Sequence, residues 1–316
     1  MIPETTKKRA QILSGAIIAE AIKREVAGDV AEIFQKYGAS PGLAVVRVGE
    51  DPASAVYVGN KVKTSRELGI VSEHLHLPET ISHEELLKTV EKLNERDDID
   101  GILVQLPLPK QINEKEILEK ISPEKDVDGF HPVNVGRLSL GQKSLTPCTP
   151  AGVIEMLKRS GIEISGKHAV VVGRSNIVGK PMAMLLLQNN ATVTICHSRT
   201  KNLAEITSQA DILVAAIGRA GFVRGEHIKE QAVVVDVGMN KVETEADVRE
   251  FFDEGELEKR LAAVNKRGST LIGDVHPREA LEKAEKLTPV PGGVGLLTVA
   301  MLMRNTVDAA KGRRFS

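Results

Sequence analysis

Tyr57 and Lys61 stand four positions apart in a segment whose sequence predicts a helix. At that spacing both side chains project from the same helix face. A phenol and an amine on one face can orient a substrate and exchange protons with it. A chance pair of surface residues is the alternative, and the spacing alone does not decide between them.

Other polar groups follow predicted buried strands. Gln105 comes at the end of the apolar run that begins at Gly101 and is followed by Leu106-Pro-Leu-Pro109. Ligands of α/β proteins bind at the carboxyl ends of such strands. Lys125-Asp-Val-Asp128-Gly129 places two acids on a tight loop, where a solvated turn is the alternative reading.

Two glycine-rich segments suggest close contact between backbone and ligand. Thr288-Pro-Val-Pro-Gly-Gly-Val-Gly295 precedes a predicted helix, and its glycines allow the loop to lie close against a flat ligand. His168–Gly179 reads as a strand, a glycine turn and a helix that begins near Ile177. Such a turn presents free N–H groups to a phosphate. Its Gly-x5-Gly spacing differs from the usual dinucleotide motif, so an ordinary strand–helix turn stays open.

The next predicted strand indicates which dinucleotide would bind. Cys196 is followed by His197-Ser-Arg-Thr200, with no acid to bind a ribose 2′-hydroxyl. Arg174, Ser198 and Arg199 instead offer cations and a hydroxyl that suit a 2′-phosphate. Together with the glycine turn, these residues favour NADP over NAD.

Strands and helices alternate along the whole chain, which predicts parallel α/β architecture. The first helix is expected over residues ~11–37, and a capping box at Ser82 and Glu85 opens a later one. The proline-containing segment 141–151 is the expected domain boundary, with Thr149 as N-cap and Pro150 as the first helical residue. Residues 241–267 are predicted to be a charged helical surface elaboration, and the last helix to return to the first domain. Strands are expected at 43–48, 71–77, 101–105, 168–172, 191–196, 211–216 and 232–236.

Composition excludes several classes of protein. A net charge of −1 and only 3% aromatic residues argue against nucleic-acid binding. Cys148 and Cys196 are expected to be buried thiols in a reducing compartment, and His74 and His76 an exposed strand and not a metal site. The longest apolar run is far short of the ~20 residues of a membrane span, and the polar N-terminus does not resemble a secretory signal. We therefore expect a cytoplasmic protein.

Taken in order, these segments closely resemble the bifunctional methylenetetrahydrofolate dehydrogenase/methenyltetrahydrofolate cyclohydrolase family. The resemblance extends from about residue 11 to 310. The matching segments are Pro41–Gly49, Asp51–Ser54, Tyr57-x3-Lys61, Val104–Pro107, Lys125–Gly129, Pro147–Pro150, Gly173–Gly179, Thr288–Gly295 and Thr298–Met303.

The resemblance implies two α/β domains, the second a Rossmann-like parallel sheet, with an active-site cleft between them. Residues 1–150, completed by 288–316, would bind folate, and residues 151–287 would bind NADP. The implied activity is oxidation of 5,10-methylenetetrahydrofolate to 5,10-methenyltetrahydrofolate with NADP, then hydrolysis to 10-formyltetrahydrofolate. One-carbon metabolism, purine biosynthesis and a homodimer paired through the cofactor domain are implied with it.

The resemblance also implies roles for individual residues. Lys61 would be the main catalytic residue with Gln105 beside it, Tyr57 would stack on the folate, and Asp128 would grip the pterin. The other implied folate contacts are Val104, Leu106, Pro291, Gly292, Gly293, Val294 and Gly295. The implied cofactor contacts are Thr149, Gly173, Arg174, Ser175, Ser198, Arg199, Met239 and Thr298.

Three features depart from the family pattern. Leu296 stands where the family has proline, Met239 stands where it has isoleucine, and residues 241–267 form a longer stretch than is typical. A dehydrogenase with a weakened cyclohydrolase step is one alternative function. A non-catalytic folate or NADP-binding regulator is another, but the intact set of Tyr57, Lys61, Gln105 and Asp128 argues against it.

Overall fold

The structure, a computed structural model, describes residues 9–315, which form two compact units. Of these residues, the chain up to Ile18 and Gly152–Leu297 make unit 1. Ala19–Ala151 and the chain from Thr298 onward make unit 2. Residues 288–297, assigned above to the folate-binding domain, thus lie in unit 1.

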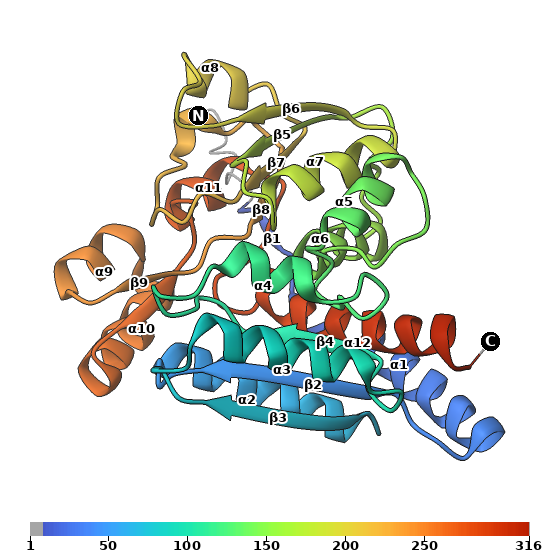
Figure 1. The fold of residues 1–316 in the computed structure, drawn as a ribbon. Helices are drawn as coiled ribbons and strands as arrows, with labels where there is room; N and C mark the ends of the chain where they lie inside the picture. The colour runs from blue at the N-terminus through green and yellow to red at the C-terminus, as the bar shows by residue number, and fades with distance from the viewer. Residues whose placement is uncertain (1–8, 316) are drawn as a thin grey trace, which may run out of the picture. The chain divides into compact units, whose positions relative to one another are not determined.

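Unit 2 contains a parallel sheet with the strand order β3-β2-β4. The chain passes from β2 (Gly42–Val48) through α2 (Pro52–Glu67) to β3 (Val71–Leu77), and then through α3 (His83–Glu95) to β4 (Gly101–Val104). Because both crossovers are right-handed and run in opposite directions, α2 and α3 cover opposite faces of the sheet (Figure 1).

Alternate residues of the central strand explain this packing. Ala44, Val46 and Val48 belong to one buried cluster with Leu86 and Val90 of α3. The predicted capping box of α3 is confirmed, since the side chains of Ser82 and Glu85 each accept the other's backbone N–H. The other helices with residues in unit 2 are α1 (Gly15–Tyr37), α4 (Glu114–Lys120), α5 (Pro132–Ser139), α6 (Cys148–Arg159) and α12 (Val294–Arg313).

Unit 1 contains a parallel six-stranded sheet with the order β1-β11-β8-β7-β5-β6. From β5 the chain moves outward to β6 and then back across β5 to β7, so the winding direction reverses between β5 and β7. The Rossmann-like sheet predicted from the sequence is therefore confirmed. Its strands are β1 (Gln11–Ile12), β5 (His168–Val172), β6 (Thr192–Cys196), β7 (Ile212–Ala215), β8 (Val233–Asp236) and β11 (Lys286–Leu287). Its helices are α7 (Gly179–Gln188), α8 (Leu203–Thr207), α11 (Pro277–Lys283) and the 3-10 turn η1 (Gly225–His227).

Three predicted helix starts are wrong. The first helix begins at Gly15 and not near residue 11, because Gln11–Ile12 pairs with β11. α6 begins at Cys148, so Thr149 lies inside the helix and is not its N-cap. α7 begins at Gly179, two residues later than predicted, because the glycine turn continues up to it.

The charged stretch 241–267 is largely helical, as predicted, but it also has a core of its own. It comprises α9 (Glu245–Phe251) and α10 (Glu254–Arg267), beside the antiparallel pair β9 (Asn240–Val242) and β10 (Thr270–Ile272). Buried Val242, Val248 and Phe251 pack with Ile272. A separate cluster of apolar side chains therefore supports this elaboration.

Two sequence expectations concern thiols and apolar helices. Cys148 and Cys196 are free and buried, as expected. Within residues 9–315, no helix combines the length and apolar character that crossing a bilayer requires.

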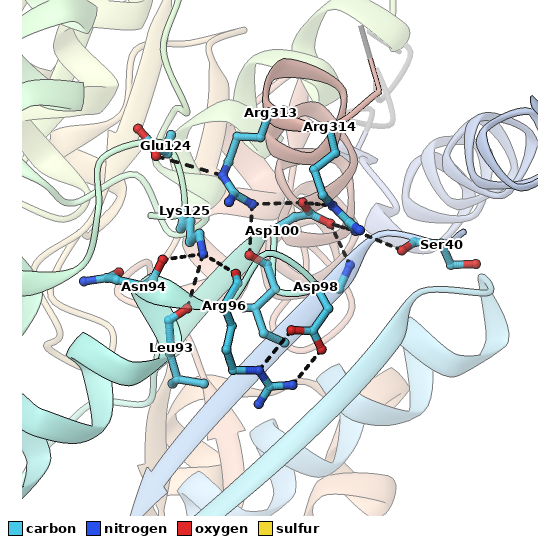
Figure 2. Close-up of polar contacts among 12 residues, drawn as sticks. Ser40, Leu93, Asn94, Arg96, Asp98, Asp100, Glu124, Lys125, Arg313 and Arg314 are labelled. Carbon is cyan, nitrogen blue, oxygen red and sulfur yellow. Dashed lines mark hydrogen bonds and ion pairs between the residues drawn. The ribbon is translucent and has the colours of Figure 1, made fainter. Parts of the chain in front are cut away.

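A buried carboxylate fixes the end of α12 within unit 2. Asp100 has no exposed surface, and its oxygens accept N–H groups from Gly42 at 2.9 Å, Arg313 at 3.0 Å and Arg314 at 2.8 Å (Figure 2). Asp100 also lies directly before β4, so the carboxylate links the starts of the neighbouring strands β2 and β4 to the final helix. Asp98, two residues away, pairs with Arg96 but is 66% exposed.

Replacing Asp100 by alanine should lower the free energy of unfolding by about 3 kcal/mol, because two arginines lose a buried partner. Asp98→Ala removes an exposed ion pair and should cost below about 1 kcal/mol. Urea denaturation of both variants measures the difference. Equal losses would contradict a special role for Asp100.

Candidate active site

The helix that carries Tyr57 and Lys61 is set by the residues at its start. The Asp51 carboxylate accepts the backbone N–H of Ser54 at 2.6 Å, and Pro52 fills the first helical position. These residues satisfy the helix N-terminus and fix its direction. Tyr57 and Lys61 then lie one turn apart on α2, and Tyr57 is 41% exposed. An exposed aromatic face beside an amine can support a flat substrate.

Lys61 and Gln105 meet, as the sequence resemblance implied. The Lys61 ammonium donates to Gln105 Oε1 at 3.0 Å. Gln105 follows β4, where its backbone N–H donates to the Val46 carbonyl, and its own side-chain amide donates to the Leu106 carbonyl at 2.6 Å. Both ends of the amide are therefore committed, and the amide holds the amine at the carboxyl end of the sheet.

The loop that carries Asp128 is held by its neighbours. The side chain of Lys125 is buried, and its ammonium donates to the carbonyls of Leu93, Asn94 and Arg96 at the end of α3 (Figure 2). The loop is also fixed by Asp126, whose carboxylate accepts N–H groups from Phe130, His131 and Asn134. The hydrogen bonds of Lys125 and Asp126 thus hold the loop in place without using the Asp128 side chain.

Asp128 is partly buried beside Lys61. Burial raises its pKa to about 6, while the Lys61 charge lowers it and the Asp126 charge raises it further. Among the residues that the structure describes, none donates a hydrogen bond to the Asp128 carboxylate. It is therefore available to accept N–H groups from a ligand.

Sequence reasoning missed Asn305, which supports the same loop from α12. Its side-chain amide donates to the carbonyls of Val127 at 2.8 Å and Thr146 at 2.9 Å. The Cys148 thiol also donates to the Val127 carbonyl, at 3.2 Å. Burial and the nearby Asp128 carboxylate raise the pKa of this thiol, so it is protonated at neutral pH. An isolated amide in an apolar helix carries no signal in the sequence that would have identified it.

The proposed phosphate-binding turn of unit 1 depends on two glycines. Gly173 has a φ of +132°, and a Cβ there would lie 2.1 Å from the Ala216 carbonyl oxygen. A Cβ on Gly179 would lie 2.4 Å from the Gly173 carbonyl oxygen. Only glycine therefore fits at both positions of this tightly packed turn. The Ser175 hydroxyl accepts the N–H groups of Val178 and Gly179. This cradle lies where the winding of the sheet reverses, which is where doubly wound sheets bind dinucleotides.

The residues expected to hold a 2′-phosphate lie on adjacent strand ends. The Gly173 N–H donates to the Cys196 carbonyl at 2.9 Å, so Arg174 and Ser198 follow strands β5 and β6 side by side. Arg174, Ser198 and Arg199 are all exposed. A dianionic phosphate can therefore be approached by both cations and the hydroxyl.

The glycine loop 288–295 also belongs to unit 1. A Cβ on Gly15 would lie 2.0 Å from the Gly293 carbonyl oxygen, so α1 starts directly against this loop. Arg260 of α10 donates to the Val290 carbonyl at 3.0 Å. The long charged stretch 241–267, for which no role was predicted, therefore supports this loop. α12 begins at Val294 although Leu296 replaces the family's proline, and Leu296 is exposed in its first turn.

The structure divides the predicted site residues between the two units. Tyr57, Lys61, Val104, Gln105, Leu106 and Asp128 belong to unit 2, as do Thr149 and Thr298, whose hydroxyls lie 2.9 Å apart. Gly173, Arg174, Ser175, Ser198, Arg199, Met239 and Pro291–Gly295 belong to unit 1.

Two family descriptions match the chain. "Tetrahydrofolate dehydrogenase/cyclohydrolase, catalytic domain" matches residues 13–128, and the NAD(P)-binding domain of the same family matches residues 147–314. The chain belongs to the tetrahydrofolate dehydrogenase/cyclohydrolase family.

Individual relatives of the chain support the same family assignment. Bifunctional protein FolD of Koribacter versatilis is 59% identical, with 96% of this chain and 98% of that protein covered. A crystal structure of FolD from Campylobacter jejuni has a TM-score of 0.86 at 43% identity and covers 96% of this chain and 99% of its own. FolD of Trypanosoma brucei, solved with NADP and an inhibitor, has a TM-score of 0.86 at 39% identity and covers 96% and 98%.

The histidine pair His74 and His76 is stacked on β3 of this family member. His76 contacts the Arg47 guanidinium at 2.8 Å and the Gly49 carbonyl at 3.0 Å. In the part of the chain that the structure describes, no group of three His, Cys, Asp or Glu residues is arranged to hold a metal ion.

The raised pKa of Asp128 predicts how folate binding depends on pH. If the carboxylate accepts N–H groups from the pterin, affinity is full above pH 6 and is lost as the pH falls through 6. A non-reacting folate analogue should then bind about tenfold more weakly at pH 5 than at pH 7. Asp128→Asn should abolish this pH dependence and weaken binding at pH 7 by ~2–4 kcal/mol. A native pH dependence in the variant would contradict the role of Asp128.

Proposed function

We propose that Tyr57, Lys61, Gln105 and Asp128 bind and convert the folate, and that the glycine turn with Arg174 and Ser198 binds NADP. The protein is an NADP-dependent methylenetetrahydrofolate dehydrogenase and methenyltetrahydrofolate cyclohydrolase of one-carbon metabolism. It oxidises 5,10-methylenetetrahydrofolate to 5,10-methenyltetrahydrofolate and hydrolyses this to 10-formyltetrahydrofolate. The contact between Lys61 and Gln105, close to the Asp128 carboxylate, is the observation that carries the assignment of residues.

Orientation is the main task of the protein in the first reaction. Two nitrogens flank the methylene carbon and stabilise the cation that remains after hydride loss, so little acid–base help is needed. NADP accepts the hydride. We propose that Asp128 fixes the pterin through its adjacent N–H donors and that the Tyr57 ring supports the aminobenzoate group. Rigid support of Asp128 by Lys125, Asp126 and Asn305 limits movement of the ring.

The second reaction needs a proton acceptor. Water adds to the methenyl carbon and must lose a proton as the new C–O bond forms. The bond from that carbon to N5 then breaks and a proton goes to N5, so that the formyl group stays on N10. Lys61 is the candidate proton acceptor, because its side-chain nitrogen contacts Gln105 at the carboxyl end of β4. We propose that Lys61, in its neutral amine form, accepts this proton and that Gln105 keeps the amine aligned.

Lys61→Met keeps the apolar stem and removes the amine, so cyclohydrolase activity should fall by ~10²–10⁴-fold. Dehydrogenase activity should fall much less, and methenyltetrahydrofolate should accumulate. The two initial rates are measured separately by absorbance. Lys63→Met on the same helix is a matched control, because Lys63 is 75% exposed and pairs only at the surface with Glu67. Equal loss of both activities in Lys61→Met would mean that the lysine only positions the substrate.

The position of Arg174 predicts cofactor preference. Arg174→Ala should reduce the preference for NADP over NAD by ~1.5–3 kcal/mol, which is the range for a charge-assisted hydrogen bond. The ratio of kcat/KM for the two cofactors measures this loss. Arg249→Ala, an exposed arginine of α9 that pairs with Glu245, should leave the ratio unchanged. An unaltered ratio in Arg174→Ala would show that Arg174 does not contact the 2′-phosphate.

We also propose a cytoplasmic homodimer that pairs through unit 1 and supplies purine biosynthesis. β6 is the last strand of its sheet and so offers unpaired backbone groups, and Ile195 on this strand is 42% exposed. Leu187, on the preceding helix, is 64% exposed. Light scattering of the native protein tests this proposal, since a monomer would refute it.

A further inference from the structure

Two carboxylates that the proposed chemistry does not use are buried in unit 1. Asp236 is the last residue of β8, and Asp274 follows β10. Asp274 has no exposed surface, and Asp236 is 4% exposed. Buried carboxylates are costly unless hydrogen-bond donors compensate them, so their partners show what they are for.

Asp274 joins two loops that follow neighbouring strands. Its Oδ2 accepts the backbone N–H groups of Ile217 at 2.6 Å and Gly218 at 3.0 Å. Its Oδ1 accepts the N–H of Arg219 at 2.8 Å and the side-chain amide of Asn240 at 3.0 Å. Residues 217–219 follow β7, and Asn240 begins β9 four residues after the end of β8. One carboxylate therefore links the chain segments that follow these two strands.

Asp236 fixes Asp274 in turn. Its carboxylate accepts N–H groups from Gly238 at 2.9 Å, Asp274 at 2.8 Å and Val275 at 2.9 Å. A Cβ on Gly273 would lie 1.8 Å from Asp236 Oδ2, and a Cβ on Gly238 would lie 2.3 Å from Asp274 Oδ1. The backbone at Gly238 and Gly273 therefore packs directly against the two carboxylates.

These loops border the cofactor cradle. Residues 217–219 begin directly after Ala216, whose carbonyl oxygen the Gly173 backbone approaches so closely that only glycine fits. Asn240 follows Met239, which is 42% exposed and would lie 3.2 Å from a Cβ on Gly295. Three consecutive N–H groups such as 217–219 form a concave anion site. Because Asp274 fills that site, a pyrophosphate is left to the cradle at Gly173–Gly179.

We propose that Asp274 is a positioning residue for hydride transfer. The 2′-phosphate is placed after β6 and the pyrophosphate at the turn after β5, so the nicotinamide half continues towards the loops after β7 and β8, which Asp274 fixes. The proposal rests on the placement of NADP given above. Asp274 itself touches no reacting atom in this account. Its effect should therefore appear in the reaction that uses NADP and not in the hydrolysis that does not.

Asp274→Asn tests the proposal, since an amide has one acceptor oxygen where the carboxylate has two. Dehydrogenase kcat should fall about 10–100-fold through misalignment, while cyclohydrolase activity in the same sample stays within about twofold. Asn240→Ala removes only one of the four contacts and should lower dehydrogenase kcat by a few-fold, again selectively. Asn240→Ala decides the question if Asp274→Asn does not fold. With methylene-deuterated substrate, the kinetic isotope effect should increase in both variants, because hydride transfer becomes the slower step.

Asp211→Asn is the matched control. Asp211 also accepts a backbone N–H, from His168 at 2.9 Å, but it lies just before β7, at the opposite end of the sheet. The Asp211→Asn variant should leave both activities and the isotope effect unchanged. Unchanged dehydrogenase activity in the Asp274 and Asn240 variants, or parallel loss of both activities, would overturn the proposal. If Arg174→Ala and NADP titration still support the cradle, that failure concerns Asp274 alone; if they do not, the placement of NADP itself is wrong.

Discussion

Buried aspartates that accept backbone N–H groups shape the loops on which function depends. Asp126 closes the turn that contains Asp128, Asp274 joins the loops after β7 and β8, and Asp100 fixes the end of α12. Each carboxylate replaces water around N–H groups that no strand or helix can satisfy. An aspartate suits this task because two oxygens on a short side chain accept several donors at once. Loops built in this way are rigid and still leave their outer faces for ligands.

The same arrangement explains how one chain can support two reactions. Asp128 and Lys61 lie in unit 2 with opposite formal charges, and neither is neutralised by a full ion pair within the described residues. Lys61 is instead held by the neutral amide of Gln105. In the proposed assignment, the Asp128 carboxylate is thereby left for pterin donors and the neutral Lys61 amine for a proton from water. Most of the residues proposed to bind NADP lie in unit 1. Substitutions of these residues should therefore alter the oxidation without altering the hydrolysis.

The sequence revealed most of the fold because periodic apolar residues and turn formers are local signals. Seven of the nine parallel strands, the capping box at Ser82 and the glycine turn were predicted correctly, whereas β1 and β11 were not. The starts of α1, α6 and α7 were also missed. β1 forms only by pairing with the distant β11, nothing local separates Cys148 from Pro150 as the first helical residue, and the glycine turn continues up to Gly179. Asn305 and Asp274 escaped prediction for the same reason: their partners lie far away in sequence. The roles of Lys61, Gln105 and Asp128 came from a family resemblance, and the structure adds the contact between Lys61 and Gln105.

The most direct test of this account is a crystal structure of the protein with NADP and a non-reacting folate analogue. The account predicts pterin N–H groups within about 2.7–3.2 Å of the Asp128 carboxylate, and the 2′-phosphate of NADP at Arg174 and Ser198. It also predicts that Lys61 still contacts Gln105 in that complex. A pterin bound away from Asp128, or a dinucleotide bound away from the Gly173 turn, would contradict it.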